Sequence, residues 1–85
     1  MEKQKTVAVI GASNDRRKYG NKAVRAYILR GFKVYPVNPN EDTIEGLKAY
    51  KSILDIPDEI DRATFYVLPK IGMKIIEEVA KKGVK

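Results

Sequence analysis

Thr6-Val7-Ala8-Val9-Ile10-Gly11-Ala12-Ser13 is the stretch of this sequence that most restricts its fold. The first five residues form a continuous apolar and β-branched run, which is typical of a strand buried on both faces of a parallel sheet. Gly11 ends the run, and the largely polar residues 12–19 separate it from a helical pattern. The stretch therefore predicts a buried parallel strand followed by a strand-to-helix loop.

The next residues complete a strand–helix–strand unit. A helix is predicted to begin at about Gly20-Asn21 and to end at Gly31, which is well placed for a helix C-cap. Residues 32–37 predict a second strand, which Asn38-Pro39-Asn40 ends because proline cannot donate to a strand ladder. Such a unit is right-handed, because strands twist in one direction. Its predicted helix has an apolar stripe of Ala23, Val24, Tyr27 and Ile28, and a water-facing side of Lys22, Arg25 and Arg30.

The second half of the sequence predicts a third strand and a second helix. Residues 63–68 form a β-rich run closed by Pro69, and residues 70–82 follow a helical pattern that ends at Gly83. Between them and the first unit, a long connection is expected to hold a short strand near residues 48–50 and a helical turn near residues 52–54. The predicted apolar rows of the second helix are Ile71, Ile75 and Val79, and Gly72, Ile76 and Ala80. The fold class is α/β, with a doubly wound, mostly parallel sheet and flanking helices.

Length and composition limit the kind of protein this is. Eighty-five residues, of which 44% are apolar and 33% charged, indicate a soluble globular chain with one domain over residues 1–85. The sequence has no Cys and no His, so it lacks a thiolate nucleophile, Cys-based metal sites and the commonest general base. No apolar run approaches the length of a membrane span, and no signal-peptide pattern opens the chain. We therefore expect a cytoplasmic binding module and no independent catalysis.

The positive charge of the chain is concentrated where a phosphate could bind. Residues 1–30 hold eight basic and two acidic side chains, and Arg16, Arg17 and Lys18 are consecutive in the first strand-to-helix loop. The same loop offers Gly11-Ala12-Ser13, whose small side chains let a ligand approach the backbone, and the start of a helix, which favours anions. Three such loops, at residues 11–20, 37–40 and 68–72, are expected at the carboxyl edge of one sheet. Together they predict a pyrophosphate or sugar-phosphate site.

Each of these features also has a purely structural interpretation. Gly11 allows tight packing of a strand against a helix, the basic triplet is compatible with a solvated loop, and residues 38–40 are compatible with a simple turn. Tyr19 and Tyr27 are interpreted as packing residues. The acidic residues Asp55, Asp58, Glu59 and Asp61 suggest a solvated surface more than a metal site. The convergence of the loops on one edge favours the functional interpretation.

A dinucleotide cofactor fits this edge poorly. The nicotinamide fingerprint requires G-x-G-x-x-G and an acidic residue after the second strand, which binds the ribose 2′-hydroxyl. Here Ser13 replaces the second glycine, and Asn38 occupies the end of the second strand. An adenosine that carries a phosphate on its ribose suits a basic edge without a carboxylate. Coenzyme A is such a ligand, because it has a 3′-phosphate in addition to its pyrophosphate.

Three motifs in this order resemble a known family. They are V-A-V-I-G-A-S at Val7–Ser13, G-F-K-V-Y-P-V-N-P at Gly31–Pro39 and Y-x-S-I-x-D-I-P at Tyr50–Pro57, with Asp61 opening the next strand. The combination resembles the small CoA-binding-domain proteins, a Rossmann-like group related to the CoA-binding domains of succinyl-CoA synthetase alpha subunits and ADP-forming acyl-CoA synthetases. The resemblance covers essentially the whole chain.

The resemblance implies a coenzyme A or acyl-CoA ligand and a set of residues that line it. Leu68 and Pro69 would form a wall on the adenine or pantetheine side, and Tyr19 is included as a loop neighbour. Ser13 would be a phosphate-binding hydroxyl and not a nucleophile. The nucleotide would be lined by Gly11, Ala12, Ser13, Arg17, Lys18, Asn38 and Pro39.

The chain departs from this family after Gly83. Relatives continue into a further strand with a W-x-Q-x-G-like segment, then another helix and strand, so we expect a C-terminally incomplete domain. An open sheet edge is then expected, through which the chain could self-associate. Two alternative functions remain open at this stage, an NAD(H)-binding domain of an oxidoreductase or redox sensor and a basic nucleic-acid-binding module. Tyr19 is the only aromatic candidate for the second.

Overall fold

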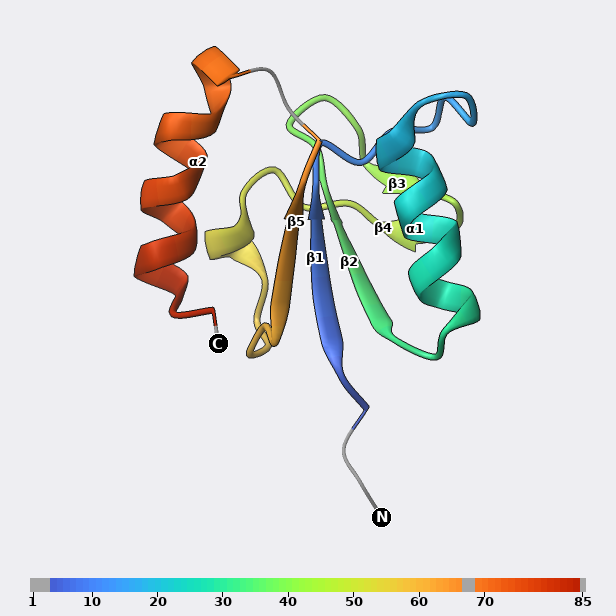
Figure 1. The fold of residues 1–85 in the computed structure, drawn as a ribbon, viewed down its shortest axis with the longest axis horizontal. Helices are drawn as coiled ribbons and strands as arrows, with labels where there is room; N and C mark the ends of the chain where they lie inside the picture. The colour runs from blue at the N-terminus through green and yellow to red at the C-terminus, as the bar shows by residue number, and fades with distance from the viewer. Residues whose placement is uncertain (1–3, 67–68, 85) are drawn as a thin grey trace.

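The computed structural model describes residues 4–66 and 69–84 and contains one parallel sheet between helices. The sheet has the strand order β2-β1-β5, with β1 in the centre (Figure 1). A second, two-stranded sheet pairs β3 with β4 in antiparallel fashion. This arrangement confirms the predicted α/β class with flanking helices. In chain order the elements are β1 (Thr6–Ile10), α1 (Tyr19–Leu29), β2 (Lys33–Val37), β3 (Thr43–Ile44), β4 (Leu47–Lys48), the 3₁₀ helix η1 (Ile53–Asp55), β5 (Arg62–Phe65) and α2 (Pro69–Lys82).

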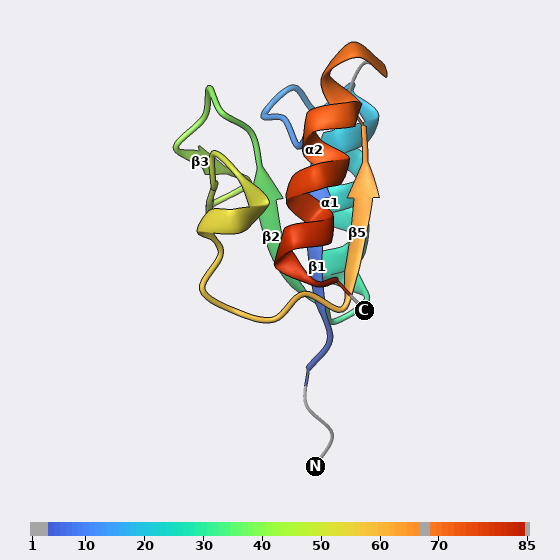
Figure 2. The same cartoon turned by 90° about the vertical axis from the view of Figure 1, so that its left-hand side faces the viewer.

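Every residue of β1 is buried, as its apolar run predicts. Successive side chains of a strand point to opposite faces, so Val7 and Val9 pack into one layer and Ala8 and Ile10 into the other. The first layer is closed by α1 and the β3–β4 hairpin, and the second by η1 and α2. Figures 1 and 2 show the two helices on opposite sides of the sheet. The sheet is therefore covered on both faces, which parallel sheets require.

The end of α1 confirms the role predicted for Gly31. This residue has φ +84°, and its N–H donates to the Ile28 carbonyl at 3.0 Å. The N–H of Phe32 donates to the Tyr27 carbonyl at 3.0 Å, and the rings of Tyr27 and Phe32 lie 4.9 Å apart. These contacts form a Schellman motif with its hydrophobic contact. Because Phe32 takes part in this motif, β2 begins at Lys33, one residue later than predicted.

The helical stripes are narrower than predicted. The buried residues of α1 all lie in its first half, so Ile28 is 42% exposed. Arg25 does not face water as predicted; it is half-buried, and its guanidinium donates to Asn21 Oδ1 at 2.8 Å. In α2, Ile75 and Val79 pack against the second layer as predicted, whereas Ile76 is 60% exposed because one face of the helix meets the core. The side chains of Ile71 and Gly72 lie outside the described residues.

The predicted boundary between the third strand and the second helix needs correction. β5 is predicted over residues 63–68 but runs from Arg62 to Phe65, and Pro69 is the first residue of α2. A proline suits this position because the first helical residues have no intrahelical partner for their N–H groups. Leu68 lies outside the described residues. Pro69 therefore begins a helix and does not close a strand.

The connection between β2 and β5 contains a hairpin that is not predicted from the sequence. β3 and β4 pair around Glu45 (φ +50°) and Gly46 (φ +80°), the left-handed pair of a tight hairpin turn. The strand predicted near residues 48–50 is thus β4 at residues 47–48, and Tyr50 instead forms a bridge with Val37. The predicted helical turn is η1, which Ser52 caps by accepting from the Leu54 N–H at 3.1 Å.

The acidic stretch before β5 holds the fold together. Asp61 Oδ2 accepts from the buried Thr6 N–H at 3.0 Å, and the Asp61 N–H donates to Thr6 Oγ1 at 2.9 Å. Asp58 accepts from the Tyr35 hydroxyl at 2.9 Å and lies 3.7 Å from the Lys33 ammonium. These side chains fix the start of β5 against β1 and β2. Among the described residues, no cluster of three metal-ligating side chains forms, and no helix is long and apolar enough to cross a membrane.

Candidate functional site

Two of the predicted loops meet at the carboxyl edge of the sheet. The Gly11 N–H donates to the Val37 carbonyl at 3.0 Å, and the Asn38 side-chain amide donates to the Ala12 carbonyl at 2.8 Å. Asn38 Oδ1 in turn accepts from the Asn40 N–H at 2.8 Å. Asn38 therefore joins the turn after β2 to the turn after β1. The third loop contains Leu68, which lies outside the described residues, and nothing is described of the Pro69 side chain.

Two glycines let α1 begin directly against the turn after β1. Gly11 has φ +87°, a conformation that favours glycine. A Cβ at Gly20 would lie 2.2 Å from the Gly11 carbonyl oxygen and 3.2 Å from the Ala12 Cα, so no other residue fits without a backbone shift. Gly20 is not among the predicted site residues, because its place in the sequence predicts the start of a helix. Its spacing from Gly11 does not follow the dinucleotide fingerprint, so the fingerprint could not reveal it.

Within the part of the chain that the structure describes, the N-terminus of α1 lacks a side-chain cap. Its N-cap residue is Lys18, which is extended and makes no side-chain capping bond, and the first turn contains no acidic residue. The first N–H groups of a helix lack intrahelical partners, and they carry the positive end of the helix dipole. This end of the helix therefore favours an anion that approaches the turn formed by Gly11 and Gly20.

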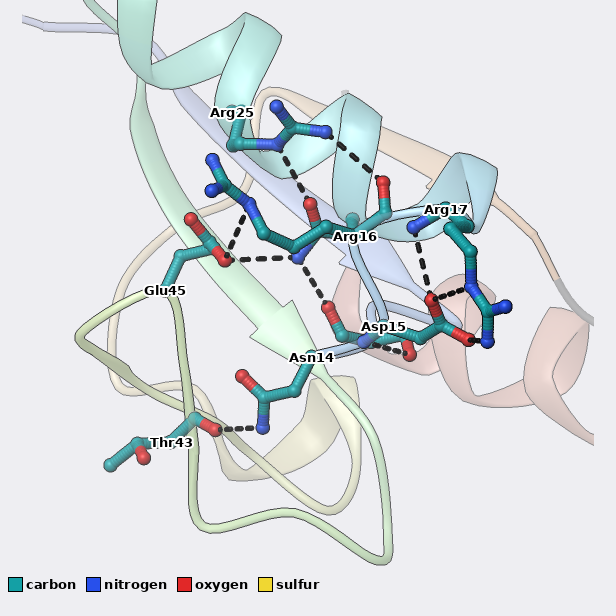
Figure 3. Close-up of polar contacts among 9 residues, drawn as sticks. Asn14, Asp15, Arg16, Arg17, Arg25, Thr43 and Glu45 are labelled. Carbon is teal, nitrogen blue, oxygen red and sulfur yellow. Dashed lines mark hydrogen bonds and ion pairs between the residues drawn. The ribbon is translucent and has the colours of Figure 1, made fainter.

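The loop before α1 is ordered by short side-chain contacts. Ser13 Oγ accepts from the Asp15 N–H at 3.0 Å, and Asp15 Oδ1 accepts from the Arg17 N–H at 3.0 Å. The Arg17 guanidinium binds both carboxylate oxygens of Asp15, each at 3.1 Å (Figure 3). The hydrogen bonds from Arg17 lower the pKa of Asp15, and the Asp15 carboxylate raises the pKa of Arg17. Arg17 is thus already paired with an anion of its own loop.

The three residues of the basic triplet, Arg16, Arg17 and Lys18, therefore make different contacts. Arg16 lies 3.8 Å from a carboxylate oxygen of Glu45 in the β3–β4 hairpin, and its carbonyl accepts from Arg25 at 3.2 Å (Figure 3). Lys18 makes no ion pair within the part of the chain that the structure describes. Of the three consecutive cations, Lys18 is consequently the one without a salt bridge among the described residues, although its charge adds to the effect of Arg17 in lowering the pKa of Asp15.

A buried asparagine connects this loop to the hairpin. Asn21 is fully buried, and its amide group donates to the Ser13 carbonyl at 2.8 Å and to Glu45 Oε2 at 3.1 Å. On the outer side, the Asn14 amide group donates to the Thr43 carbonyl at 2.8 Å (Figure 3). It also donates to Glu41 Oε2 at 2.6 Å. The hairpin therefore holds the loop in place, although sequence analysis assigned no role to either asparagine.

Two cavities open at this edge, and Gly11 lines both. The first has a volume of about 370 Å³ and is largely apolar, with Lys51 and Glu78 as its charged residues. The second has a volume of about 320 Å³. The first cavity is lined by Ile10, Gly11, Val37, Asn38, Pro39, Asn40, Lys51, Ile53, Ile75 and Glu78. The second is lined by Gly11, Lys18, Tyr19, Gly20 and Tyr66.

The cavities include predicted residues and add others. Of the predicted site residues, those that line a cavity are Gly11, Lys18, Tyr19, Asn38 and Pro39. Tyr19 is 74% exposed, so its interpretation as a packing residue is wrong. The cavity residues that sequence reasoning did not select come from elements distant in the chain, and they are Asn40, Lys51, Ile53, Tyr66, Ile75 and Glu78.

The arrangement suits a ligand with a flat apolar part and phosphate groups. The apolar walls of the first cavity can hold a ring, while the N-terminus of α1 and Lys18 favour an anion next to Gly11. Because Gly11 and Gly20 have no side chains where they approach each other, a ligand there would meet the backbone. The residues present therefore fit the nucleotide portion of a coenzyme.

Comparison with known proteins shows to which family the chain is similar. The family model described as "CoA binding domain" matches residues 5–85. The chain is 52% identical over 83 residues to the ADP-forming acetate–CoA ligase II of Archaeoglobus fulgidus. The matched region covers 95% of this chain but only 12% of that relative. A hypothetical protein from Pyrococcus horikoshii OT3 has a similar structure, with a TM-score of 0.92, 38% identity and coverage of 98% of this chain and 58% of that one.

A second solved structure belongs to a larger enzyme. It is the dinucleotide-forming acetyl-coenzyme A synthetase 1 of Ca. Korarchaeum cryptofilum, in complex with phosphate and ADP. Its TM-score is 0.87 at 39% identity, with 94% of this chain and 18% of that chain covered. The likenesses confirm a Rossmann-like fold.

Proposed function

This chain belongs to the CoA-binding domain family, and we propose that it binds coenzyme A or an acyl-CoA at the carboxyl edge of the β2-β1-β5 sheet. The observation that carries the proposal is the contact between Gly11 and Gly20 beside an uncapped helix N-terminus. A pyrophosphate at this position would accept from N–H groups that have no side-chain cap. The family match supplies the coenzyme that has such a group.

The two cavities suggest how the coenzyme would be divided. The adenosine would occupy the larger cavity against Pro39, and the pyrophosphate would lie over Gly11 and close to Lys18. The Ser13 hydroxyl accepts from the Asp15 N–H and can still donate its own proton to a phosphate oxygen. The pantetheine would leave along the smaller cavity, past Tyr19 and Tyr66. Arg17 contributes to phosphate binding only if it releases Asp15.

We propose binding without catalysis for this chain. The relatives named as ligases are much longer, and the chain spans 12% of the A. fulgidus enzyme, so their activity is not carried over. The sequence also lacks His and Cys, the commonest general base and the strongest neutral-pH nucleophile among side chains. Its physiological role would be to hold a CoA thioester or free CoA for another reaction.

The other functions and properties that the sequence predicts receive less support than CoA binding. An NAD(H)-binding domain and a nucleic-acid-binding module gain no support from the family match. Self-association through the open edge of β5, where Phe65 and Tyr66 are each 43% exposed, stays a prediction that sedimentation analysis of the purified chain can test. A cytoplasmic location likewise stays a prediction.

Isothermal titration calorimetry with CoA, NAD and a DNA duplex tests the proposed function. We expect CoA to bind with a stoichiometry of one per chain, and NAD to bind at least tenfold more weakly, a difference of about 1.4 kcal/mol. Duplex binding with a steep salt dependence, in the absence of CoA binding, would instead identify a nucleic-acid-binding module. Tighter binding of NAD than of CoA would identify the dinucleotide alternative.

A further inference from the structure

The larger cavity is lined by Lys51, a lysine that takes no part in the proposed pyrophosphate site. Lys51 lines this cavity from a segment that is fixed on both sides. The preceding Tyr50 N–H donates to the Pro36 carbonyl at 2.9 Å, and the following Ser52 caps η1. The backbone of Lys51 is thus held beside the turn after β2, although the side chain itself is exposed. A flexible ammonium group on a fixed anchor can reach an anion in the cavity.

The charge of Lys51 is not opposed by an ion pair with any described residue. In the neighbouring loop, Arg16 and Arg17 both have carboxylate partners. Lys18 and Lys51 therefore remain as ammonium groups without such a partner, and each lines one of the two cavities that share Gly11. The edge of the sheet thus offers separate cationic positions for two phosphate-bearing parts of one ligand.

Glu78, the other charged residue of the larger cavity, disfavours the binding of an anion unless Lys51 offsets its charge. Glu78 accepts from the Ser52 hydroxyl at 3.1 Å and contributes a negative charge to the cavity lining. A phosphate that enters the cavity would meet repulsion from this carboxylate unless a cation stands beside it. Lys51 is the cation among the residues that line the cavity.

We infer that Lys51 binds the phosphate on the adenosine ribose, and so distinguishes coenzyme A from coenzymes without that phosphate. This inference rests on the proposed placement of adenosine in the larger cavity. The ribose then lies between the apolar walls and the pyrophosphate at Gly11, and its 3′-phosphate belongs to the same cavity as Lys51. The pyrophosphate, which dephospho-CoA also carries, belongs to Lys18 and the N-terminus of α1. Lys51 thus discriminates CoA from dephospho-CoA, whereas Lys18 contributes to the affinity for both ligands.

Calorimetry with CoA and dephospho-CoA on the full chain separates these roles. We expect wild-type protein to bind CoA about tenfold more tightly than dephospho-CoA, the scale of one charge-assisted hydrogen bond. Lys51→Gln should weaken CoA binding about tenfold, leave dephospho-CoA binding unchanged and reduce the ratio of their dissociation constants to near one. Lys18→Gln should weaken both ligands to the same extent and keep the ratio.

Lys48→Gln is the matched control, because it removes the same charge from a nearby exposed lysine that stacks on Tyr50 and does not line the cavity. Equal changes of the ratio in Lys48→Gln and Lys51→Gln would overturn the inference in favour of a general electrostatic effect. An unchanged ratio in Lys51→Gln, or a wild-type protein that binds both ligands equally, would overturn it while the proposed function stands. If wild-type protein binds neither ligand, the proposed function itself fails.

Discussion

Gly20 carries a constraint that its place in a helix would not suggest. A helix-interior glycine normally costs about 1 kcal/mol relative to alanine, so Gly20→Ala should stabilise an ordinary helix. Here a Cβ would lie 2.2 Å from the Gly11 carbonyl oxygen, and relief requires a backbone shift at the turn after β1. We therefore expect Gly20→Ala to destabilise the fold by about 1–3 kcal/mol, the range found for overpacking. Urea unfolding measures this loss.

The matched control for Gly20→Ala is Gly31→Ala. Gly31 also requires its conformation, with φ +84°, but a Cβ there would meet nothing within 4 Å. Its replacement should cost about 1–2 kcal/mol through the left-handed backbone alone, and it should leave CoA affinity unchanged. Gly20→Ala should also weaken CoA binding by at least tenfold, because it would move the turn after β1, where the pyrophosphate is proposed to bind. Equal CoA affinity of the two variants would show that the Gly11–Gly20 contact does not form the phosphate site.

The Asp15–Arg17 pair gives the loop a measurable titration. Hydrogen bonds from Arg17 lower the pKa of Asp15. Because the folded-state pKa lies below the unfolded-state value, the interaction is present above the unfolded-state pKa and is lost as pH falls through the folded-state one. Carboxyl carbon NMR should therefore give an Asp15 midpoint below the ordinary aspartate value, and Arg17→Gln should raise it. Arg16→Gln, which removes the neighbour that faces Glu45, should leave the midpoint unchanged. Equal shifts in both variants would contradict the pairing.

At the scale of elements, the β3–β4 hairpin holds the loop before α1 through Asn21. This side chain is fully buried and makes three hydrogen bonds, to the Ser13 carbonyl, to Glu45 and from Arg25. Asn21→Ala removes these three hydrogen bonds, although Glu45 keeps its ion pair with Arg16 and Arg25 keeps its hydrogen bond to the Arg16 carbonyl. We therefore expect a loss of about 1–3 kcal/mol in the free energy of unfolding. Hydrogen exchange should show faster exchange at residues 12–18. Asn40→Ala, at an exposed position, should change stability by less than about 0.5 kcal/mol.

Elements with local patterns are the ones that the sequence predicts well. β1 has a continuous apolar run, and α1 ends at a glycine whose position requires a positive φ, so both could be placed within about a residue or two. The β3–β4 hairpin has two-residue strands, which are too short to show a period of two. Pro36 lies inside β2 although proline suggests a strand end. The Pro36 carbonyl accepts from the Tyr50 N–H and therefore points away from β1. The nitrogen and the carbonyl of one strand residue lie on the same side, so the N–H that Pro36 lacks would also point away from β1. The proline therefore removes no hydrogen bond between β1 and β2.

The candidate site divides in the same way. Gly11 and Lys18 follow from a strand-to-helix loop that is contiguous in sequence, and the structure places both at the cavities. Asp15 stands two residues before Arg17, so their pairing could have been anticipated from a turn. Lys51 and Glu78 reach the cavity only because η1 and α2 pack against the same face of the sheet, which no local pattern reveals.

At the scale of the whole molecule, the net charge of +6 does not by itself show which basic side chains are available to a ligand, because some of them are paired within the protein. Several cations of the first thirty residues bind groups of the protein, so the edge of the sheet presents a few unpaired ammonium groups and a helix N-terminus. Such a distribution of charge suits the proposed phosphate site better than it suits a diffuse basic surface. In the proposed complex, the two adjacent cavities, which share Gly11, would orient the coenzyme.

Amide NMR of the uniformly labelled chain during a titration with CoA tests this account most directly, because it reports binding and location together. We expect saturable shifts at Gly11, Ser13, Gly20 and Asn38, with Lys51 added by CoA but not by dephospho-CoA. Residues 31–33, at the opposite end of the sheet, should not respond. A spectrum that does not change with CoA, or one that changes only away from the carboxyl edge, would contradict the proposed CoA site.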